Sequence, residues 1–433
     1  MRGKILKVYF IALLLGALTG IIGSVFQLAI ARLSGIFHWV IVNVGTQSGL
    51  LTLLVSMVIS ALMAFLAWKM VVQIAPEASG SGVQEIEGAL LNERPVFWRR
   101  LLPVKFVGGI LAISGNLVIG REGPTIQMGG NLGGMLGEFF HLKRQRRNTL
   151  IAAGAAAGLA TAFNAPLAGV LFVIEEMRNQ FNFNFTNFKM VALCCVMATI
   201  TTHMIMGADP AISMTVFAAP SLKSLLLFFI FGLIVGLAGW LFNVLLMRTL
   251  KLTDKLTTRQ RLMYVTLVGA LIGLLAVLYP EAVGGGYGII EKSLTMSPSL
   301  GWLIPLVLMR LVTTLLSYNT SVPGGIFAPM LALGTLLGLA CYKILIYWMP
   351  DLSTQPGMFA VAGMGALFSA AVRAPVTGIV LVVEMTQNYS LILPLMVSCL
   401  TSTTVVQLAN NEPIYTQLLR RTLKNQRLKE HSL

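Results

Sequence analysis

Ten long apolar runs recur along this chain, and they constrain its fold more than any other feature. They span residues 8–31, 49–74, 149–175, 188–206, 222–247, 261–280, 299–318, 325–347, 357–384 and 390–409. Each run approaches or exceeds the about 20 residues that a helix needs to cross the hydrocarbon core of a bilayer. Only 11% of the 433 residues are charged, whereas soluble domains carry about 25%. The sequence therefore predicts an all-α polytopic membrane protein.

The net charge of +15 is concentrated beside these runs, where 20 of the 31 Lys and Arg residues form five groups. The groups are Arg2, Lys4 and Lys7; Arg94, Arg99, Arg100 and Lys105; Lys143, Arg144, Arg146 and Arg147; Lys251, Lys255, Arg259 and Arg261; and Arg420, Arg421, Lys424, Arg427 and Lys429. Basic residues that flank spans mark the cytoplasmic side. We therefore read the charge as a membrane-orientation signal and expect no nucleic-acid partner. Segments 207–221 and 348–356 lack Lys and Arg and are expected to be external loops.

The five groups can share one side only if an even number of crossings separates each pair. Three runs lie between the third and fourth groups and five between the fourth and fifth. Even counts return if 149–175 and 357–384 each bend back, and Pro166 and Pro375 can provide the breaks. The sequence thus predicts broken, re-entrant helices, with both termini in the cytoplasm.

The cysteine and histidine residues form no metal-binding or catalytic pattern. Cys194, Cys195, Cys341 and Cys399 lie in apolar runs, where a buried Cys usually acts as a small hydrophobe. The four His residues, at 38, 141, 203 and 431, lack ligand spacing. No Ser/His/Asp or His/Glu set stands at useful spacing, so we expect neither a metal, a cofactor nor an enzymatic activity.

An internal repeat is the most informative pattern. Pro-Glu-Ala at 76–78 and at 280–282 each precede a Gly-rich stretch, at an offset of 204. Gly-Arg-Glu-Gly-Pro at 120–124 aligns with Gly-Ile-Phe-Ala-Pro at 325–329, at an offset of 205. Ala-Pro at 165–166 aligns with Ala-Pro at 374–375, at an offset of 209. Matched motifs in one order predict two halves, 8–206 and 222–409, followed by a short cytoplasmic tail, 410–433.

The relative orientation of the two halves follows from the count of crossings. Similarity alone also permits a parallel repeat. However, the numbers of crossings that precede the two Pro-Glu-Ala motifs differ by an odd number, which favours inverted halves. Many transporters have this architecture, and their ion site lies near the midplane where discontinuous helices meet.

The Gly-rich breaks and Glu122 together indicate an ion site. A helix N-terminus at membrane depth presents backbone N–H donors and a partial positive charge, which suits an anion. Glu122 lies in Gly-Arg-Glu-Gly-Pro, and an ionisable residue inside a membrane is a functional hypothesis by default. The alternative is a structural pair with Arg121.

Glu175 and Glu176 end the apolar stretch 167–174. The count of membrane crossings places them near the cytoplasmic edge of the membrane, where acidic residues are often merely solvated. Arg178 is close enough in the sequence to pair with them. By the repeat offset, Glu384 is the equivalent of Glu175.

These motifs resemble the CLC chloride channels and transporters, most closely the bacterial proton/chloride exchangers. The matching segments cover nearly the whole chain: 80–83, 120–124, 164–169 through Glu176, 324–329, and Pro-Ile-Tyr at 413–415. The resemblance implies a homodimer in the bacterial inner membrane, with one pathway in each subunit. It also implies a single CLC-type membrane domain over 1–433, and a tail that leaves no room for regulatory nucleotide-binding domains.

The resemblance assigns roles to particular residues. Ser81 and Tyr415 would donate hydroxyls to a central chloride, and Ile326 and Phe327 would donate backbone amides. Glu122 would be the external gate, whose carboxylate competes with chloride. Glu176 would be the internal proton-transfer glutamate.

The chain departs from the family pattern at two positions. Gln84 stands where the family usually has Pro, and Val322 replaces a small residue. Both changes could alter anion affinity.

The predicted function is electrogenic exchange of chloride for protons, with Glu122 as the shared point. The alternative is a passive voltage-gated chloride channel of the same fold. A fluoride exporter fits Ser81 and Glu176 less well.

Overall fold

The fold is described from a computed structural model, over residues 2–45, 48–177, 184–295, 298–349 and 354–430. Within these ranges it is helical, and the β contacts are two isolated bridges, Gly80 with Pro323 and Gly120 with Gly325. The first half contains α1 (Arg2–Gly45), α2 (Gly49–Gln73), α3 (Val83–Leu90), α4 (Trp98–Ser114), α5 (Glu122–Phe139), α6 (Arg144–Phe163), α7 (Pro166–Glu175) and α8 (Phe185–Met206). The second half contains α9 (Leu225–Thr253), α10 (Thr258–Leu278), α11 (Tyr287–Thr295), α12 (Leu300–Asn319), α13 (Phe327–Trp348), α14 (Pro356–Val372), α15 (Pro375–Thr386) and α16 (Ile392–Leu408), and α17 (Ile414–Glu430) follows.

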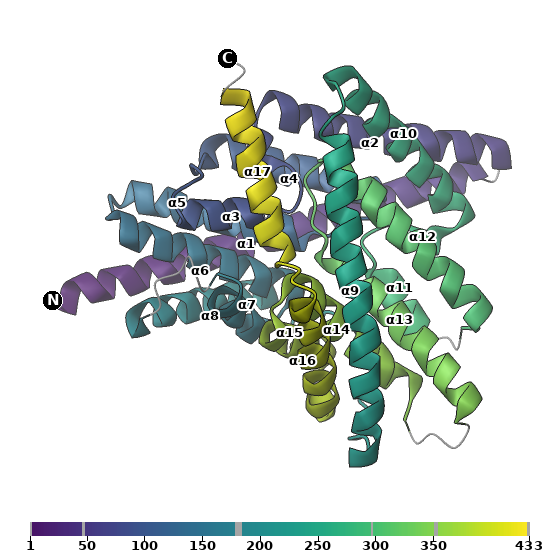
Figure 1. The fold of residues 1–433 in the computed structure, drawn as a ribbon. Helices are drawn as coiled ribbons and strands as arrows, with labels where there is room; N and C mark the ends of the chain where they lie inside the picture. The colour runs from purple at the N-terminus through teal and green to yellow at the C-terminus, as the bar shows by residue number, and fades with distance from the viewer. Residues whose placement is uncertain (1, 46–47, 178–183, 296–297, 350–353, 431–433) are drawn as a thin grey trace.

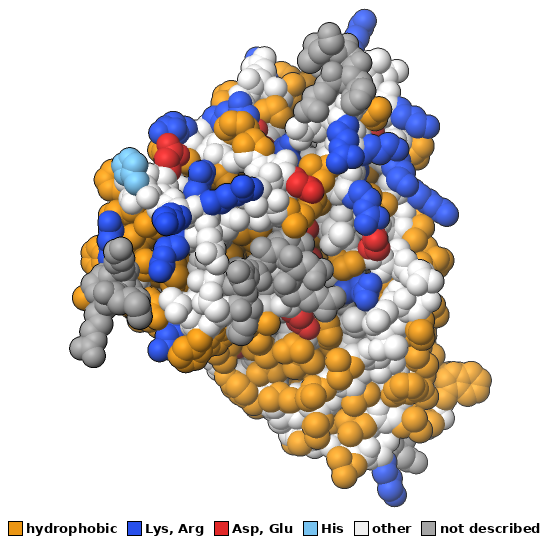
Figure 2. All heavy atoms as spheres, turned by 60° about the vertical axis from the view of Figure 1, so that its left-hand side comes forward, with side chains coloured by type: hydrophobic (Ala, Val, Ile, Leu, Met, Phe, Trp, Pro, Cys, Tyr) orange, Lys and Arg blue, Asp and Glu red, His pale blue; other side chains and the backbone are white. Residues whose placement is uncertain are grey.

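Eight of the described helices are long and apolar enough to span a membrane. They are α1, α2, α8, α9, α10, α12, α13 and α16. Many of their side chains face outward as bare hydrocarbon: Leu237 is 60% exposed and Leu267 is 66% exposed. Figure 2 shows a broad hydrophobic area below a region where Lys and Arg side chains gather. This separation of apolar and basic surface is the one that a bilayer and its aqueous boundary require.

The two predicted helix breaks are confirmed, and they share one geometry. Asn164 ends α6 with a left-handed φ of 54°, and Pro166 is the first residue of α7. Arg373 ends α14 with a φ of 61°, and Pro375 begins α15. A Pro at the first helical position costs no hydrogen bond and can begin a new direction.

The halves are inverted repeats, and they are joined by backbone hydrogen bonds between two glycines. Gly120 N donates to Gly325 O at 2.7 Å, and Gly325 N donates to Gly120 O at 2.8 Å. This antiparallel pair lies just before α5 and α13, two helices that correspond in the repeat. Both helices also lie tightly against the next one: a Cβ at Gly129 would collide with Gly154 O, and one at Gly334 with Gly363 O. In Figure 1 the two halves lie side by side, with α17 across their junction.

Hydropathy alone did not identify every helix of the membrane domain. The ten runs omitted α3, α4, α5 and α11. The reasons are that α5 is rich in Gly and polar residues, α4 carries Arg and Lys, and α3 and α11 are short. Our interpretation of Lys105 as a residue beside a span was wrong, because it is fully buried in the middle of α4.

Candidate ion-binding site

Two helix N-termini converge beside the Gly120–Gly325 pair. α5 begins at Glu122 and α13 begins at Phe327. The first N–H groups of a helix have no partner within it, and the helix dipole makes this end electropositive. Ile326 and Phe327 are both fully buried, so their N–H groups lie inside the protein. An anion at this place would meet donors without meeting a fixed Lys or Arg.

The loop that carries Ser81 closes the site from another direction. Gly82 adopts a φ of 86° immediately before α3, a conformation that favours glycine. Gly123 lies against this loop, since a Cβ there would come within 2.5 Å of Ser81 Oγ. Ser81 N donates to the Tyr318 hydroxyl at 3.4 Å. The glycines at 82 and 123 therefore let a hydroxyl reach the start of α5.

Two buried hydroxyls at this point lack a hydrogen-bond partner within the described ranges. They are Ser81 Oγ and Tyr415 Oη, both on residues with no exposed surface. The two side chains lie close enough to influence each other. The Tyr415 ring stacks against Phe327, with centroids 6.0 Å apart. Buried polar groups are nearly always hydrogen-bonded. These two hydroxyls interact with each other, and neither is hydrogen-bonded to another polar group of the described residues, so they converge where an acceptor such as an anion fits.

Glu122 is fully buried, and its contacts differ from the structural alternative stated above. Its Oε1 accepts a hydrogen bond from the Tyr287 hydroxyl at 2.7 Å. The ion pairs of the described residues do not include one between Glu122 and Arg121. Instead, the Arg121 guanidinium lies over the Tyr287 ring, 4.6 Å from its centroid. The backbone N–H groups of Glu122 and Ala328 also interact with the carboxylate. The carboxylate therefore lies at the N-termini that suit an anion.

Glu175 and Glu384 have a structural role that the sequence did not reveal. Glu175 accepts hydrogen bonds from Val376 N at 3.0 Å and Thr377 N at 2.7 Å, at the start of α15. Glu384 accepts from Leu167 N at 3.1 Å and Ala168 N at 2.8 Å, at the start of α7. Each half thus caps a helix of the other half. Glu175 is therefore a helix cap rather than a merely solvated side chain, which the sequence had left open as an alternative.

Glu176, one residue further, lies beside a second buried carboxylate. Its neighbour is Glu87 of α3, which has no exposed surface. Arg178, the expected pairing partner of Glu176, lies outside the described residues. Sequence reasoning did not single out Glu87, although a carboxylate on a short apolar helix was a signal that could have identified it.

Lys105 and Arg310 each donate hydrogen bonds to backbone carbonyl oxygens of one Gly-rich loop. The sequence pattern did not identify this role for either residue. Lys105 Nζ donates to Ala78 O at 2.9 Å and to Gly80 O at 2.6 Å. Arg310 donates to the carbonyl oxygens of Glu281, Val283 and Gly284 at 2.7–3.0 Å. The two residues stand 205 positions apart, which is the repeat offset. A search for buried charges at that offset could have found them.

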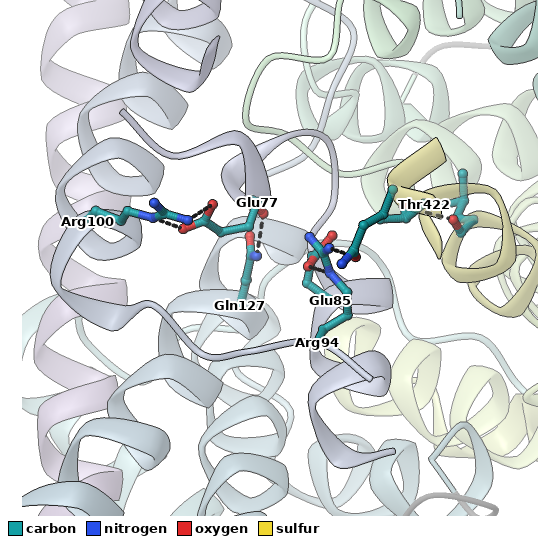
Figure 3. Close-up of polar contacts among 8 residues, drawn as sticks. Glu77, Glu85, Arg94, Arg100, Gln127 and Thr422 are labelled. Atoms are coloured by element: carbon teal, nitrogen blue, oxygen red, sulfur yellow. Dashed lines mark hydrogen bonds and ion pairs between the residues drawn. The ribbon is translucent and has the colours of Figure 1, made fainter. Parts of the chain in front are cut away.

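Salt bridges attach the Ser81 loop and α3 to their surroundings (Figure 3). Arg100 donates to both oxygens of Glu77 at 2.7 and 3.1 Å, and Gln127 Nε2 donates to Glu77 O at 2.8 Å. Arg94 Nε donates to Glu85 at 2.7 Å, and Arg94 also reaches Gln426 of α17 at 2.6 Å. These contacts fix the loop relative to α4, α5 and α17.

The two departures from the family pattern also lie in this region. Gln84 is buried, and its Oε1 has no partner within the described ranges. It lines a cavity together with Glu85, Arg94, Asp254 and Arg421. Val322 is buried, and its carbonyl oxygen accepts from Gly80 N at 3.1 Å. Val322 therefore contributes its backbone to the Ser81 loop.

No group of three or more His, Cys, Asp or Glu in the described ranges could hold a metal. The cysteines are free, with Cys194, Cys195 and Cys399 buried.

The comparison with known proteins gives a consistent picture. A family model described as "Voltage gated chloride channel" matches residues 63–407. The "H(+)/Cl(-) exchange transporter ClcA" of Vibrio cholerae is 47% identical over 99% of this chain and 92% of its own length. The protein of the same name from Salmonella schwarzengrund is 44% identical over 97% of this chain and 90% of its own length. The solved structure of a slow cyanobacterial Cl⁻/H⁺ antiporter superposes with a TM-score of 0.94 at 38% identity, covering 97% of this chain and 99% of that one.

Proposed function

This chain belongs to the voltage-gated chloride channel family, and we propose that it is a secondary active antiporter that exchanges chloride for protons across the membrane. The observation that carries the proposal is the position of Glu122. Its buried carboxylate occupies the N-termini of α5 and α13, where an anion would be held. One place thus serves a titratable group and an anion.

In this proposal the central chloride is held by Ser81, Tyr415 and the backbone amides of Ile326 and Phe327. The buried hydroxyls of Ser81 and Tyr415, which converge on one point, support the assignment. The buried start of α13 supports it as well, because its free N–H groups and dipole favour an anion. Neutral donors let the anion leave again, as transport requires.

Glu122 acts as the external gate in this scheme. When ionised, its carboxylate occupies the anion position and excludes chloride. When it takes up a proton, it loses the charge that the helix N-termini attract, and chloride replaces it. In the complete cycle, protons and chloride cross the membrane in opposite directions. Because their charges are also opposite, the cycle moves net charge and is electrogenic.

Glu176 supplies protons from the cytoplasmic side. The buried Glu87 carboxylate beside it supports this role, because two neighbouring carboxylates can pass a proton between them. A passive chloride channel, the alternative, requires no proton route. The relatives named as exchangers also favour antiport.

We propose that the subunit forms a homodimer with one pathway in each copy, in a bacterial inner membrane. The basic surface in Figure 2 supports a cytoplasmic position for that side of the molecule. Basic groups near both ends of the sequence support a cytoplasmic position for the two termini. The bounds 8–206 and 222–409 for the two halves, with 410–433 as a cytoplasmic tail, remain predictions.

The test uses purified full-length protein in vesicles with a chloride gradient and no initial pH gradient. The expected result is proton movement against its gradient, coupled to chloride flow. The reversal potential measured under combined gradients should depend on both ions. A reversal potential that follows chloride alone at every pH would instead establish the passive channel.

A further inference from the structure

We propose that Tyr287 is a positioning residue for the external gate, holding ionised Glu122 in the anion position through its hydroxyl. This inference rests on the proposed function. The observation behind it is the 2.7 Å hydrogen bond from the Tyr287 hydroxyl to Glu122 Oε1. The motifs that identified the chloride site did not include Tyr287.

The repeat shows why a hydroxyl from this loop is notable. Gly-Gly-Gly-Tyr at 284–287 corresponds to Gly-Ser-Gly-Val at 80–83. The second half has Gly285 where the first has Ser81, so it lacks the equivalent serine hydroxyl. Tyr287 provides a hydroxyl two positions later, at the start of α11. The inverted halves therefore each direct one hydroxyl toward the shared site, Ser81 from one half and Tyr287 from the other.

The surroundings of Tyr287 hold its ring in one place. Gly286 precedes it with a φ of 112°, and a Cβ there would come within 2.7 Å of Ala332 Cβ. Arg310 binds the carbonyl oxygens of the same loop. On its other side, the ring faces the Arg121 guanidinium at 4.6 Å. Because loop and ring are both constrained, the hydroxyl can donate to Glu122 at small entropic cost.

Tyr287 also lies at the entrance to the buried gate. It lines a surface cavity with Asn116, Arg121 and Lys292, whereas Glu122 has no exposed surface. The charged and titratable groups that face Glu122 are Arg121, Tyr287 and Tyr415. Lys292 and Glu281 line the same cavity and pair with each other. Only Tyr287 forms a side-chain hydrogen bond to the Glu122 carboxylate within the described part of the chain.

The hydrogen bond favours the closed gate. A donor to a carboxylate stabilises the ionised form more than the neutral one. Removal of the hydroxyl should therefore weaken the competition between Glu122 and chloride. Chloride should then bind more tightly at a pH where Glu122 is ionised.

The test compares Tyr287→Phe with wild type by calorimetric chloride binding and by exchange rate in vesicles. We expect about tenfold tighter apparent chloride binding at neutral pH, the lower end of the effect of one hydrogen bond to a charged group. The difference should shrink as the pH falls and Glu122 takes up protons. Proton coupling should persist. Tyr287→Leu also removes the hydroxyl and should change chloride binding in the same direction.

Tyr264→Phe is the matched control. It deletes a hydroxyl that donates to the Leu316 carbonyl at 2.9 Å, and chloride binding should stay at the wild-type value. In a Glu122→Gln background, Tyr287→Phe should have no further effect on chloride binding. Unchanged chloride binding in both Tyr287 variants, or an equal change in the Glu122→Gln background, would overturn the inference. These outcomes can be distinguished from a failure of the proposed function, because in that case the wild-type protein itself would show no coupled transport.

Discussion

Lys105 and Arg310 are equivalent buried cations that hold the two Gly-rich loops of the inverted halves through backbone carbonyls. Lys105 reaches Ala78 and Gly80, and Arg310 reaches Glu281, Val283 and Gly284. Both residues have no exposed surface. Each side chain is thus bound to the carbonyl dipoles of its own loop, and we expect it to shape that loop rather than to be a direct ligand of the anion.

Replacement of Lys105 by Met should weaken chloride binding. The change removes the Lys105 donor from the Ala78 carbonyl oxygen and loosens the loop that carries Ser81. An unsatisfied buried acceptor costs about 1–3 kcal/mol, so we expect roughly tenfold lower chloride affinity and a lower melting temperature in detergent. Arg99→Met is the control, because Arg99 is 72% exposed and its pair with Glu138 contributes little. Equal chloride affinities in wild type and Lys105→Met would contradict this role.

Glu122→Ala should abolish proton transport while chloride flux persists. The substitution removes the only titratable competitor that we place in the anion position, so chloride movement should lose its dependence on pH. The measurement is simultaneous recording of chloride efflux and proton uptake in vesicles. Glu138→Ala, at the exposed end of the same helix, should keep wild-type coupling. Proton pumping that survives in Glu122→Ala would remove Glu122 from the gate.

Glu176→Gln should uncouple protons by a different route. The amide keeps the size of the side chain but cannot carry a proton, so proton flux should fall to background. Chloride flux should remain, and chloride binding should change less than about twofold, because Glu176 is not a ligand in our scheme. Glu93→Gln, an exposed position, is the control. A wild-type ratio of chloride to protons in Glu176→Gln would show that protons enter elsewhere.

The attachment of α17 should depend on pH through Asp254. Arg421 of α17 donates to Asp254 at 2.7 and 2.5 Å, at the end of α9. Burial acts to raise the pKa of Asp254, but the hydrogen bonds and charge of Arg421 outweigh it and lower the pKa below its ordinary value. The resulting stabilisation is complete above the unfolded-state pKa of about 4. It is lost as the pH falls through the lower folded-state pKa.

The measurement for Asp254 is thermal unfolding of wild type and Asp254→Asn between pH 3 and pH 7. Wild type should be more stable by about 1–2 kcal/mol at pH 7, and the difference should shrink as the pH falls below the unfolded-state pKa of about 4. Chloride affinity should also drop in Asp254→Asn, because α17 carries Tyr415. Glu412→Gln removes an exposed pair with Arg420 on the same helix and should match wild type. A stability difference that is constant with pH would contradict the argument.

Glu384→Gln should destabilise the contact between the two halves. Its carboxylate accepts two backbone N–H groups at the start of α7, and a charged cap at a helix N-terminus contributes about 1–2 kcal/mol. Glu175→Gln should have a similar effect at α15, since Glu175 accepts the equivalent bonds. Unfolding in detergent measures both, with Glu93→Gln as the control. If neither variant were less stable than wild type, the caps would be without energetic consequence.

Much of the architecture could be predicted from the chain alone. Long apolar runs predicted the spans, and Pro166 and Pro375 marked the breaks that the structure contains. The repeat offset correctly paired Glu175 with Glu384. It also aligned α5 with α13, whose preceding glycines bond to each other. These features are local or periodic in the sequence, so they can be recognised without the three-dimensional structure.

The partners of the buried polar groups could not be predicted in this way. Tyr287 lies 165 residues from Glu122 and yet donates to it, while the adjacent Arg121 does not pair with it. In the sequence Lys105 looks like a charge that flanks a span, but it is buried and donates to the loop that carries Ser81. The sequence by itself determined that the chain spans a membrane as two inverted halves, because hydrophobic length and repeat spacing dictate it. Only the tertiary structure decided which donor meets which carboxylate, because that depends on how helix ends from both halves converge.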